Sequence, residues 1–271
     1  MADVTNPDAD LVAALADTWG RLQELARSVP AERWTAASDL PDWDARDVLA
    51  HLVGVESLLL GRPVPADAPP VDVDHPILLV NLQWIGWYRT QPVQRALTDF
   101  VEVTDARLAM LQSATTADFD QPSWTPAGPG TVRDLLPFRA FDSWVHEQDI
   151  RDALDIPGGW EGPAAHAAVA RMRKSMGFAV GKKVAPPDGT VIGFELVGPF
   201  AQSFALSIDN GRANEVTPSD AATVQLTMPT SAFVHLTTGR GEAHAIADAQ
   251  VVVSGDVALG TRVIDAMNVL F

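Results

Sequence analysis

A change of periodicity near residue 160 divides the chain into two regions of different secondary structure. Before it, apolar residues recur every three or four positions, the spacing of helices that bury one face. After it, short runs rich in β-branched residues alternate with Gly, Pro, Asn and Asp, which is the pattern of strands and turns. This order of elements predicts an α+β protein with two domains, residues 1–158 and 159–271.

The first region predicts four to five helices joined by short or proline-rich segments. Clusters of proline and glycine at 61–76 and 121–130 predict loops. Thr131 followed by Asp134 predicts the N-terminal cap of a helix that contains Pro137 and runs to about Leu154. Such a set of helices favours a bundle. We expect its helices over residues 11–25, 44–60, 77–89, 92–111 and 131–154.

The second region predicts a small domain of strands and helices. We expect strands over 191–197, 204–208, 223–228 and 251–253, and helices over 164–183, 232–238 and 257–270.

The composition excludes several classes of function. The chain has no cysteine, so a metal site must use His, Asp or Glu, and any thiol must come from outside. A net charge of −16 argues against nucleic acid as a partner. No apolar run approaches the roughly 18 residues that span a membrane, and Met1–Asp10 lacks the apolar core of a signal peptide. We therefore expect a cytoplasmic protein with no membrane partner.

Two predicted helices carry polar residues on faces that are otherwise apolar. In 131–154, Asp142, His146 and Asp149 share the core-facing stripe, and in 44–60 His51 lies on the apolar face. Buried carboxylates need partners. Asp142 and His146 lie one turn apart, so both can bind one ion, with His51 arriving from a facing helix. Three such ligands leave a fourth position open, as in catalytic zinc sites.

The same spacing is compatible with a polar core that binds no metal. A histidine on an apolar face is usually hydrogen-bonded within the core. Asp142 and His146 can form a simple ion pair, and Asp149 can pair with Arg139 or Arg151. Spacing alone leaves both interpretations open.

Motifs in both regions match those of a known family. The helix motifs are Trp43–Leu52 (WDARDVLAHL), which follows Val29–Trp34 (VPAERW), and Phe141–Arg151 (FDSWVHEQDIR). Leu236–Arg240 (LTTGR) and Ser254–Gly260 (SGDVALG) lie near the C-terminus. In this order, and over nearly the whole chain, they resemble the mycothiol-dependent maleylpyruvate isomerase family, a branch of the DinB-like bundles with an appended domain similar to sterol-carrier proteins.

The resemblance implies a DinB-like four-helix bundle followed by a small α/β sterol-carrier-like domain. It implies a zinc ion held by His51, Asp142 and His146. The founding isomerase of the family has Glu where this chain has Asp142, and His and Asp ligands also suit other divalent metals. It further implies mycothiol, a small thiol of actinobacteria, as cosubstrate.

These features lead to a hypothesis for the activity. A metal-bound thiolate would attack an electrophilic small molecule, and the chain would be an isomerase or a thiol S-transferase. Arg240 would hold a carboxylate, although it could equally be a surface arginine after a helix-ending glycine. Asp149 would orient His146 or Arg139. Two alternatives are a non-enzymatic binder of small apolar ligands and a metal-dependent hydrolase.

Overall fold

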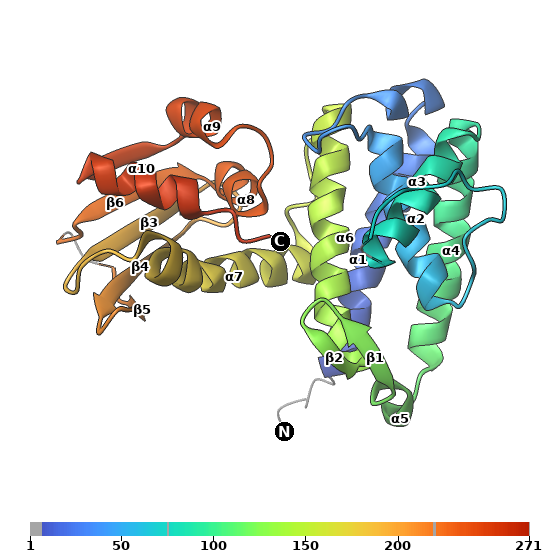
Figure 1. Ribbon diagram of the computed structural model, residues 1–271, viewed down its shortest axis with the longest axis horizontal. Helices are drawn as coiled ribbons and strands as arrows, with labels where there is room; N and C mark the ends of the chain where they lie inside the picture. The colour runs from blue at the N-terminus through green and yellow to red at the C-terminus, as the bar shows by residue number, and fades with distance from the viewer. Residues whose placement is uncertain (1–6, 75, 219–220, 271) are drawn as a thin grey trace. The chain divides into compact units, whose positions relative to one another are not determined.

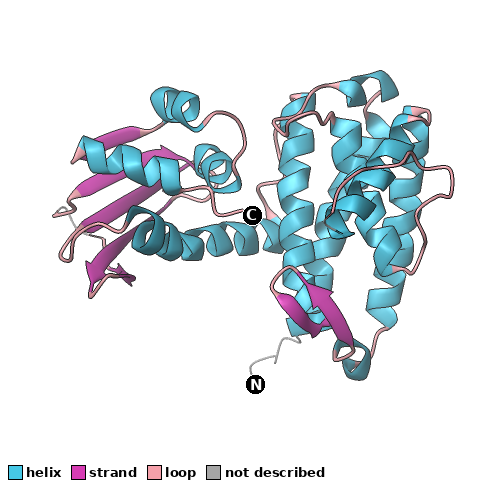
Figure 2. Cartoon of the chain, in the orientation of Figure 1, coloured by secondary structure: helices cyan, strands magenta, loops and turns pink. Residues whose placement is uncertain are grey.

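The computed structural model of the protein describes residues 7–74, 76–218 and 221–270. Within them the chain forms two compact units, with the division between Ala165 and His166. The first unit is helical, and the second contains a five-stranded sheet with its own helices (Figures 1 and 2). The predicted α+β class is therefore confirmed.

Four long helices form the body of the first unit. They are α1 (Pro7–Ser28), α2 (Ala45–Leu59), α4 (Val93–Ser113) and α6 (Val132–Leu154). Helices α1 and α2 each pack against both α4 and α6, which is the arrangement of a four-helix bundle. Helix α3 (Pro76–Arg89) packs against α2.

Large apolar side chains from all four helices fill the bundle. Those that are less than 2% exposed include Leu15, Trp19 and Leu22 of α1, Leu49 and Leu52 of α2, Phe100 of α4 and Trp144 of α6. Each such side chain stabilises the fold by about 1.5–3 kcal/mol relative to an exposed one. The apolar stripes in the sequence therefore mark the core of this unit.

Residues 122–131 form a hairpin where we expected a loop over 121–130. Strand β1 (Pro122–Thr125) pairs antiparallel with β2 (Gly128–Thr131), and β2 leads directly into α6. Pro122 lacks an N–H group, and proline is tolerated in sheets only at strand starts and edges. The proline and glycine of this hairpin therefore gave it the appearance of a loop. The short helices η1 (Ala31–Thr35) and α5 (Thr116–Phe119) complete the unit.

The second unit is built on a mixed sheet with the strand order β5-β4-β3-β6-β7. Its strands are β3 (Val191–Val197), β4 (Gln202–Asp209), β5 (Arg212–Val216), β6 (Val224–Pro229) and β7 (Val252–Gly255). Strand β3 pairs parallel with β6 and antiparallel with β4. Strand β5 was not predicted, because this edge strand is mostly exposed and polar.

Helices α8 (Thr230–Thr238) and α10 (Val257–Ala266) pack against β6 (Figure 1). Helix α7 (Gly162–Phe178) continues into a π-helical segment, η2 (Ala179–Val184). Helix α9 (Ala243–Gln250) was missed, because only Ile246 of this short helix is buried. Among the described residues of the whole chain, no helix has both the length and the apolar character needed to cross a membrane.

Three phenylalanines form the centre of the second unit. Phe194 of β3 and Phe204 of β4 are direct cross-strand partners, and their rings stack with centroids 4.7 Å apart. Phe233 of α8 meets Phe204 edge-on at 6.2 Å. All three side chains are less than 2% exposed. Aromatic packing therefore fills the space between the sheet and α8.

Candidate metal centre

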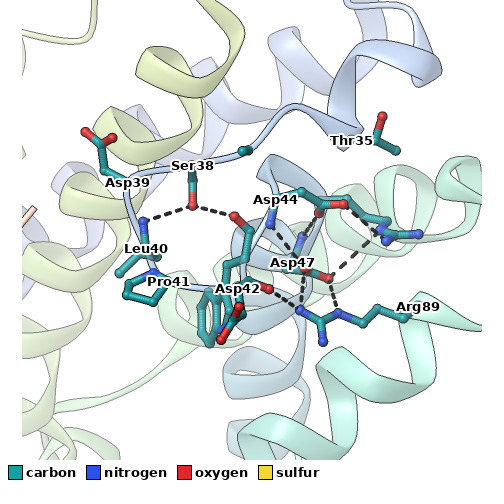
Figure 3. A pocket seen from close by; sticks show the side chains of 12 residues that line it. Thr35, Ser38, Asp39, Leu40, Pro41, Asp42, Asp44, Asp47 and Arg89 are labelled. Carbon is teal, nitrogen blue, oxygen red and sulfur yellow. Dashed lines mark hydrogen bonds and ion pairs between the residues drawn. The ribbon is translucent and has the colours of Figure 1, made fainter. Parts of the chain in front are cut away.

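The start of α2 is fixed by hydrogen bonds that involve three charged side chains. Asp44 accepts from the backbone N–H of Asp47 at 2.8 Å, and Asp47 accepts from that of Asp44 at 3.1 Å. Arg89, at the end of α3, donates to both oxygens of Asp47 at 2.8 and 3.1 Å (Figure 3). This first turn places His51, one turn further along, beside the fully buried Val48 and Leu52.

The start of α6 is fixed in the same way. The Thr131 and Asp134 side chains each accept from the other's backbone N–H, as the sequence predicted. Asp142 and His146 then lie one turn apart on the side of α6 that meets α2.

The structure brings His51, Asp142 and His146 together. Each offers one ligand atom, and these atoms all lie within 4.8 Å of one another. Nε2 of His51 lies 3.3 Å from Oδ2 of Asp142, and Nε2 of His146 lies 3.6 Å from Oδ1. The imidazole side chains are 9% and 10% exposed, whereas the Asp142 side chain is 31% exposed. Solvent therefore reaches the cluster at Asp142.

The other nitrogen of each imidazole, Nδ1, faces an oxygen that can accept a hydrogen bond but cannot donate one. Nδ1 of His146 lies 2.7 Å from Oδ2 of Asp149, and Nδ1 of His51 lies 2.8 Å from Oδ1 of Asn81. In the neutral rings both Nδ1 atoms therefore carry the proton, and both Nε2 atoms direct a lone pair at Asp142. Lone pairs facing a carboxylate repel it unless a proton or a metal cation lies between them. The donor set thus fits a divalent metal ion.

The ionisation states of Asp142 and His146 agree with this arrangement. Burial by itself raises the pKa of Asp142, but the nearby Arg139 guanidinium, and the two imidazoles when they carry a positive charge, lower that pKa well below its usual value. Burial lowers the pKa of His146, and the carboxylates of Asp142 and Asp149 offset this only in part. At neutral pH Asp142 is charged and His146 is neutral, which are the forms that bind metal.

Asn81 is a member of the site that the sequence analysis missed. It lies on α3, three and four residues before the buried Trp84 and Ile85, and so on the same helical face. A polar residue on this otherwise apolar face was the signal that could have identified it. Asp149 lies against His146, the position that its expected orienting role requires.

Arg240 lies in the second unit, just after α8. Its side chain is buried, at 8% exposure, and Nη1 donates to the Thr238 carbonyl at 2.6 Å. The alternative of a surface arginine is therefore wrong. The preceding Gly239 has a φ of 65°, a left-handed conformation that favours glycine at a helix end. The role of Arg240 toward a carboxylate stays a prediction.

Two family models match the chain. The model of the mycothiol maleylpyruvate isomerase N-terminal domain matches residues 15–151, about half of the chain. The chain belongs to this family. The model of the SCP-2 sterol transfer family matches residues 173–268, within the second unit. Both relationships agree with the resemblance that the sequence motifs indicated.

Solved structures support the same fold. The chain is similar to the crystal structure of the mycothiol-dependent maleylpyruvate isomerase, with a TM-score of 0.55 and 15% identity. A mutant of that isomerase gives a TM-score of 0.54, also at 15% identity. Each comparison covers 92% of this chain and 93% of the other. No curated protein matches the chain.

Proposed function

We propose that the protein is a metal-dependent enzyme, with zinc as its ion, that uses an external thiol to attack a small electrophile. Mycothiol is the thiol that the family relationship supports. The reaction would be an isomerisation or the transfer of the thiol to the electrophile. His51, Asp142 and His146 would hold the ion, and their donor atoms also suit other divalent metals.

The observation that carries this proposal is the orientation of the two imidazoles. In the neutral rings, Asn81 and Asp149 accept from the Nδ1 protons, so that both Nε2 lone pairs are directed at Asp142. A divalent ion held among these atoms would accept both lone pairs and pair with the Asp142 carboxylate. Three protein ligands and an exposed edge at Asp142 correspond to a catalytic zinc site, in which one position stays open.

The chain's own residues limit what the chemistry can be. Without cysteine the chain supplies no thiol, so the nucleophile is a separate small molecule. A bound divalent ion lowers the pKa of a thiol and so supplies a thiolate at neutral pH. The sulfur would then add to one carbon of an activated double bond, and the π electrons of that bond would move to form an enolate. Rotation about the resulting single bond and expulsion of the thiolate would re-form the double bond and give isomerisation. Protonation of the enolate, or loss of halide from an aryl halide, would leave the thiol attached and give transfer. A cytoplasmic location, where small thiols stay reduced, completes the proposal.

The second unit gives little support to the alternative of an apolar ligand binder. Phe194, Phe204 and Phe233 pack against one another and occupy the space between the sheet and α8. A ligand there would have to displace buried aromatic rings, each of which contributes to the core. The match of this unit to the sterol transfer family therefore supports its fold and does not by itself support ligand binding.

Turnover measurements test the proposal. The full-length protein is incubated with mycothiol and either maleylpyruvate or an activated aryl halide, with and without a chelator. We expect turnover of at least one of them that requires both thiol and metal and is lost in His146→Ala. Turnover that survives chelation would contradict the metal-dependent mechanism. Turnover that needs metal but no thiol would favour a hydrolase instead.

A further inference from the structure

A buried arginine lies directly behind the candidate metal centre. Arg139 precedes Asp142 by one turn of α6, and its Nη1 donates to Oδ2 of Asp142 at 2.8 Å. The same guanidinium donates from Nε to Oε1 of Glu56 on α2 at 2.8 Å, and its Nη2 lies 2.7 Å from that oxygen. Arg139 is thus held between two carboxylates, and one of them belongs to the metal centre.

Glu56 is itself fixed from a third helix. Nε of Arg107, on α4, donates to Oε2 of Glu56 at 3.2 Å. Arg107 and Glu56 are buried, with 3% and 1% of their surface exposed. The chain of contacts runs from Arg107 through Glu56 and Arg139 to Asp142, and it connects α4, α2 and α6. Since a planar guanidinium bonded at several nitrogens has a fixed orientation, Arg139 holds the Asp142 carboxylate in one plane.

Stability alone is a poor reason for such a network. Charges taken out of water lose their hydration, and well-packed apolar residues of similar volume often stabilise a core as well or better. The network ends at Asp142, a carboxylate that faces both imidazoles. Oδ2 of Asp142, which accepts from Arg139, faces Nε2 of His51. Oδ1 faces Nε2 of His146.

We propose that Arg139, anchored by Glu56, is a positioning residue that orients Asp142 for metal binding. This inference rests on the proposed function, because it assigns a supporting residue to the same site. Aspartate has one methylene group fewer than glutamate, so its oxygens reach the ion from fewer conformations. The guanidinium holds the side chain in a conformation in which both imidazoles and the carboxylate converge.

The test compares two buried arginines of the same helix in the full-length protein. Arg139→Met removes the bond to Asp142. Arg151→Met is the matched control, because Arg151 is similarly buried and is paired with the buried Glu147 at 2.9 Å. The zinc dissociation constant is measured for both variants by competition with a chelator, and unfolding by urea is measured in parallel. We expect Arg139→Met to bind zinc about 10–100-fold more weakly and Arg151→Met to retain the wild-type constant.

A spectroscopic readout accompanies the affinities. The visible absorption of bound Co²⁺ reports the ligand geometry, and we expect it to change in Arg139→Met alone. If Arg139→Met does not fold, Arg139→Lys replaces it. Lysine keeps a buried cation near Glu56 but cannot fork onto two carboxylates, so we again expect weaker binding.

Two outcomes separate this inference from the proposed function. Wild-type zinc affinity and an unchanged Co²⁺ spectrum in the Arg139 variant would overturn the positioning role while the metal centre stands. Failure of the wild-type protein to bind any zinc would overturn the proposed function itself, and the positioning role with it.

Discussion

Removal of the Asp149 carboxylate tests how the orientation of His146 supports metal binding. The Asp149→Ala substitution deletes a 2.7 Å hydrogen bond between buried partners and leaves the Nδ1 proton of His146 without this acceptor. Loss of a carboxylate that orients a ligating histidine weakens metal binding about 10–100-fold, or about 1.4–2.8 kcal/mol. The Asp149→Asn substitution keeps an oxygen acceptor but loses its charge, and we expect it to fall between wild type and Asp149→Ala.

The assay is zinc competition against a chromophoric chelator at neutral pH, with the protein folded in every sample. The control is Glu147→Gln, which alters a fully buried carboxylate of the same helix. Glu147 pairs with Arg21 and Arg151, so this variant should lose stability but keep its zinc affinity. Equal affinities for Asp149→Ala and wild type would refute the argument that the Nδ1 partner of His146 supports the site.

Three further predictions follow from the same geometry. The Asn81→Leu substitution removes the acceptor for Nδ1 of His51, and chelator competition should show zinc binding about 10-fold weaker. Unchanged zinc binding would speak against Asn81 as the residue that orients His51. The Gly54→Ala substitution would place a Cβ only 2.8 Å from Trp84 and should cost about 1–3 kcal/mol in urea unfolding; a neutral effect would contradict the close packing of α2 and α3. The folded pKa of His146 lies below its unfolded value of about 6.5, so the metal-free unfolded chain takes up a proton first as the pH falls. The free energy of unfolding of the metal-free protein should therefore decrease between pH 7.5 and 5.5, and it should decrease less in His146→Gln. An equal decrease in both proteins would exclude His146 as the cause.

The sequence predicted the elements whose apolar residues repeat on one face. Helices α1, α2, α4 and α6 were expected because their buried side chains recur every three or four residues. The hairpin β1–β2 was not, because its prolines and glycines are those of a loop. The edge strand β5 was missed because it buries little of its surface. Secondary structure held mainly by backbone pairing thus leaves a weak pattern in the sequence.

The candidate site was predictable to a similar degree. His51, Asp142 and His146 were conspicuous because each is polar on a core-facing stripe, and the structure brings them together. Glu56 and Arg107 gave no such signal, since charged residues on a helix are usually solvated. Only the packing of α2 against α4 and α6 shows that their charges meet inside the bundle. The spacing of residues along one helix predicts which of them share a face. It does not predict which residues of another helix that face contacts.

The zinc content of the purified protein tests the central claim most directly. The full-length chain, prepared without a histidine tag, is measured by plasma emission beside His51→Ala and a control, His244→Ala, whose side chain is 73% exposed. We predict about one zinc per chain in the wild type and in the His244 variant, and none in His51→Ala. One full equivalent of zinc in His51→Ala, or none in the wild type after zinc is supplied, would contradict the assignment of the metal centre.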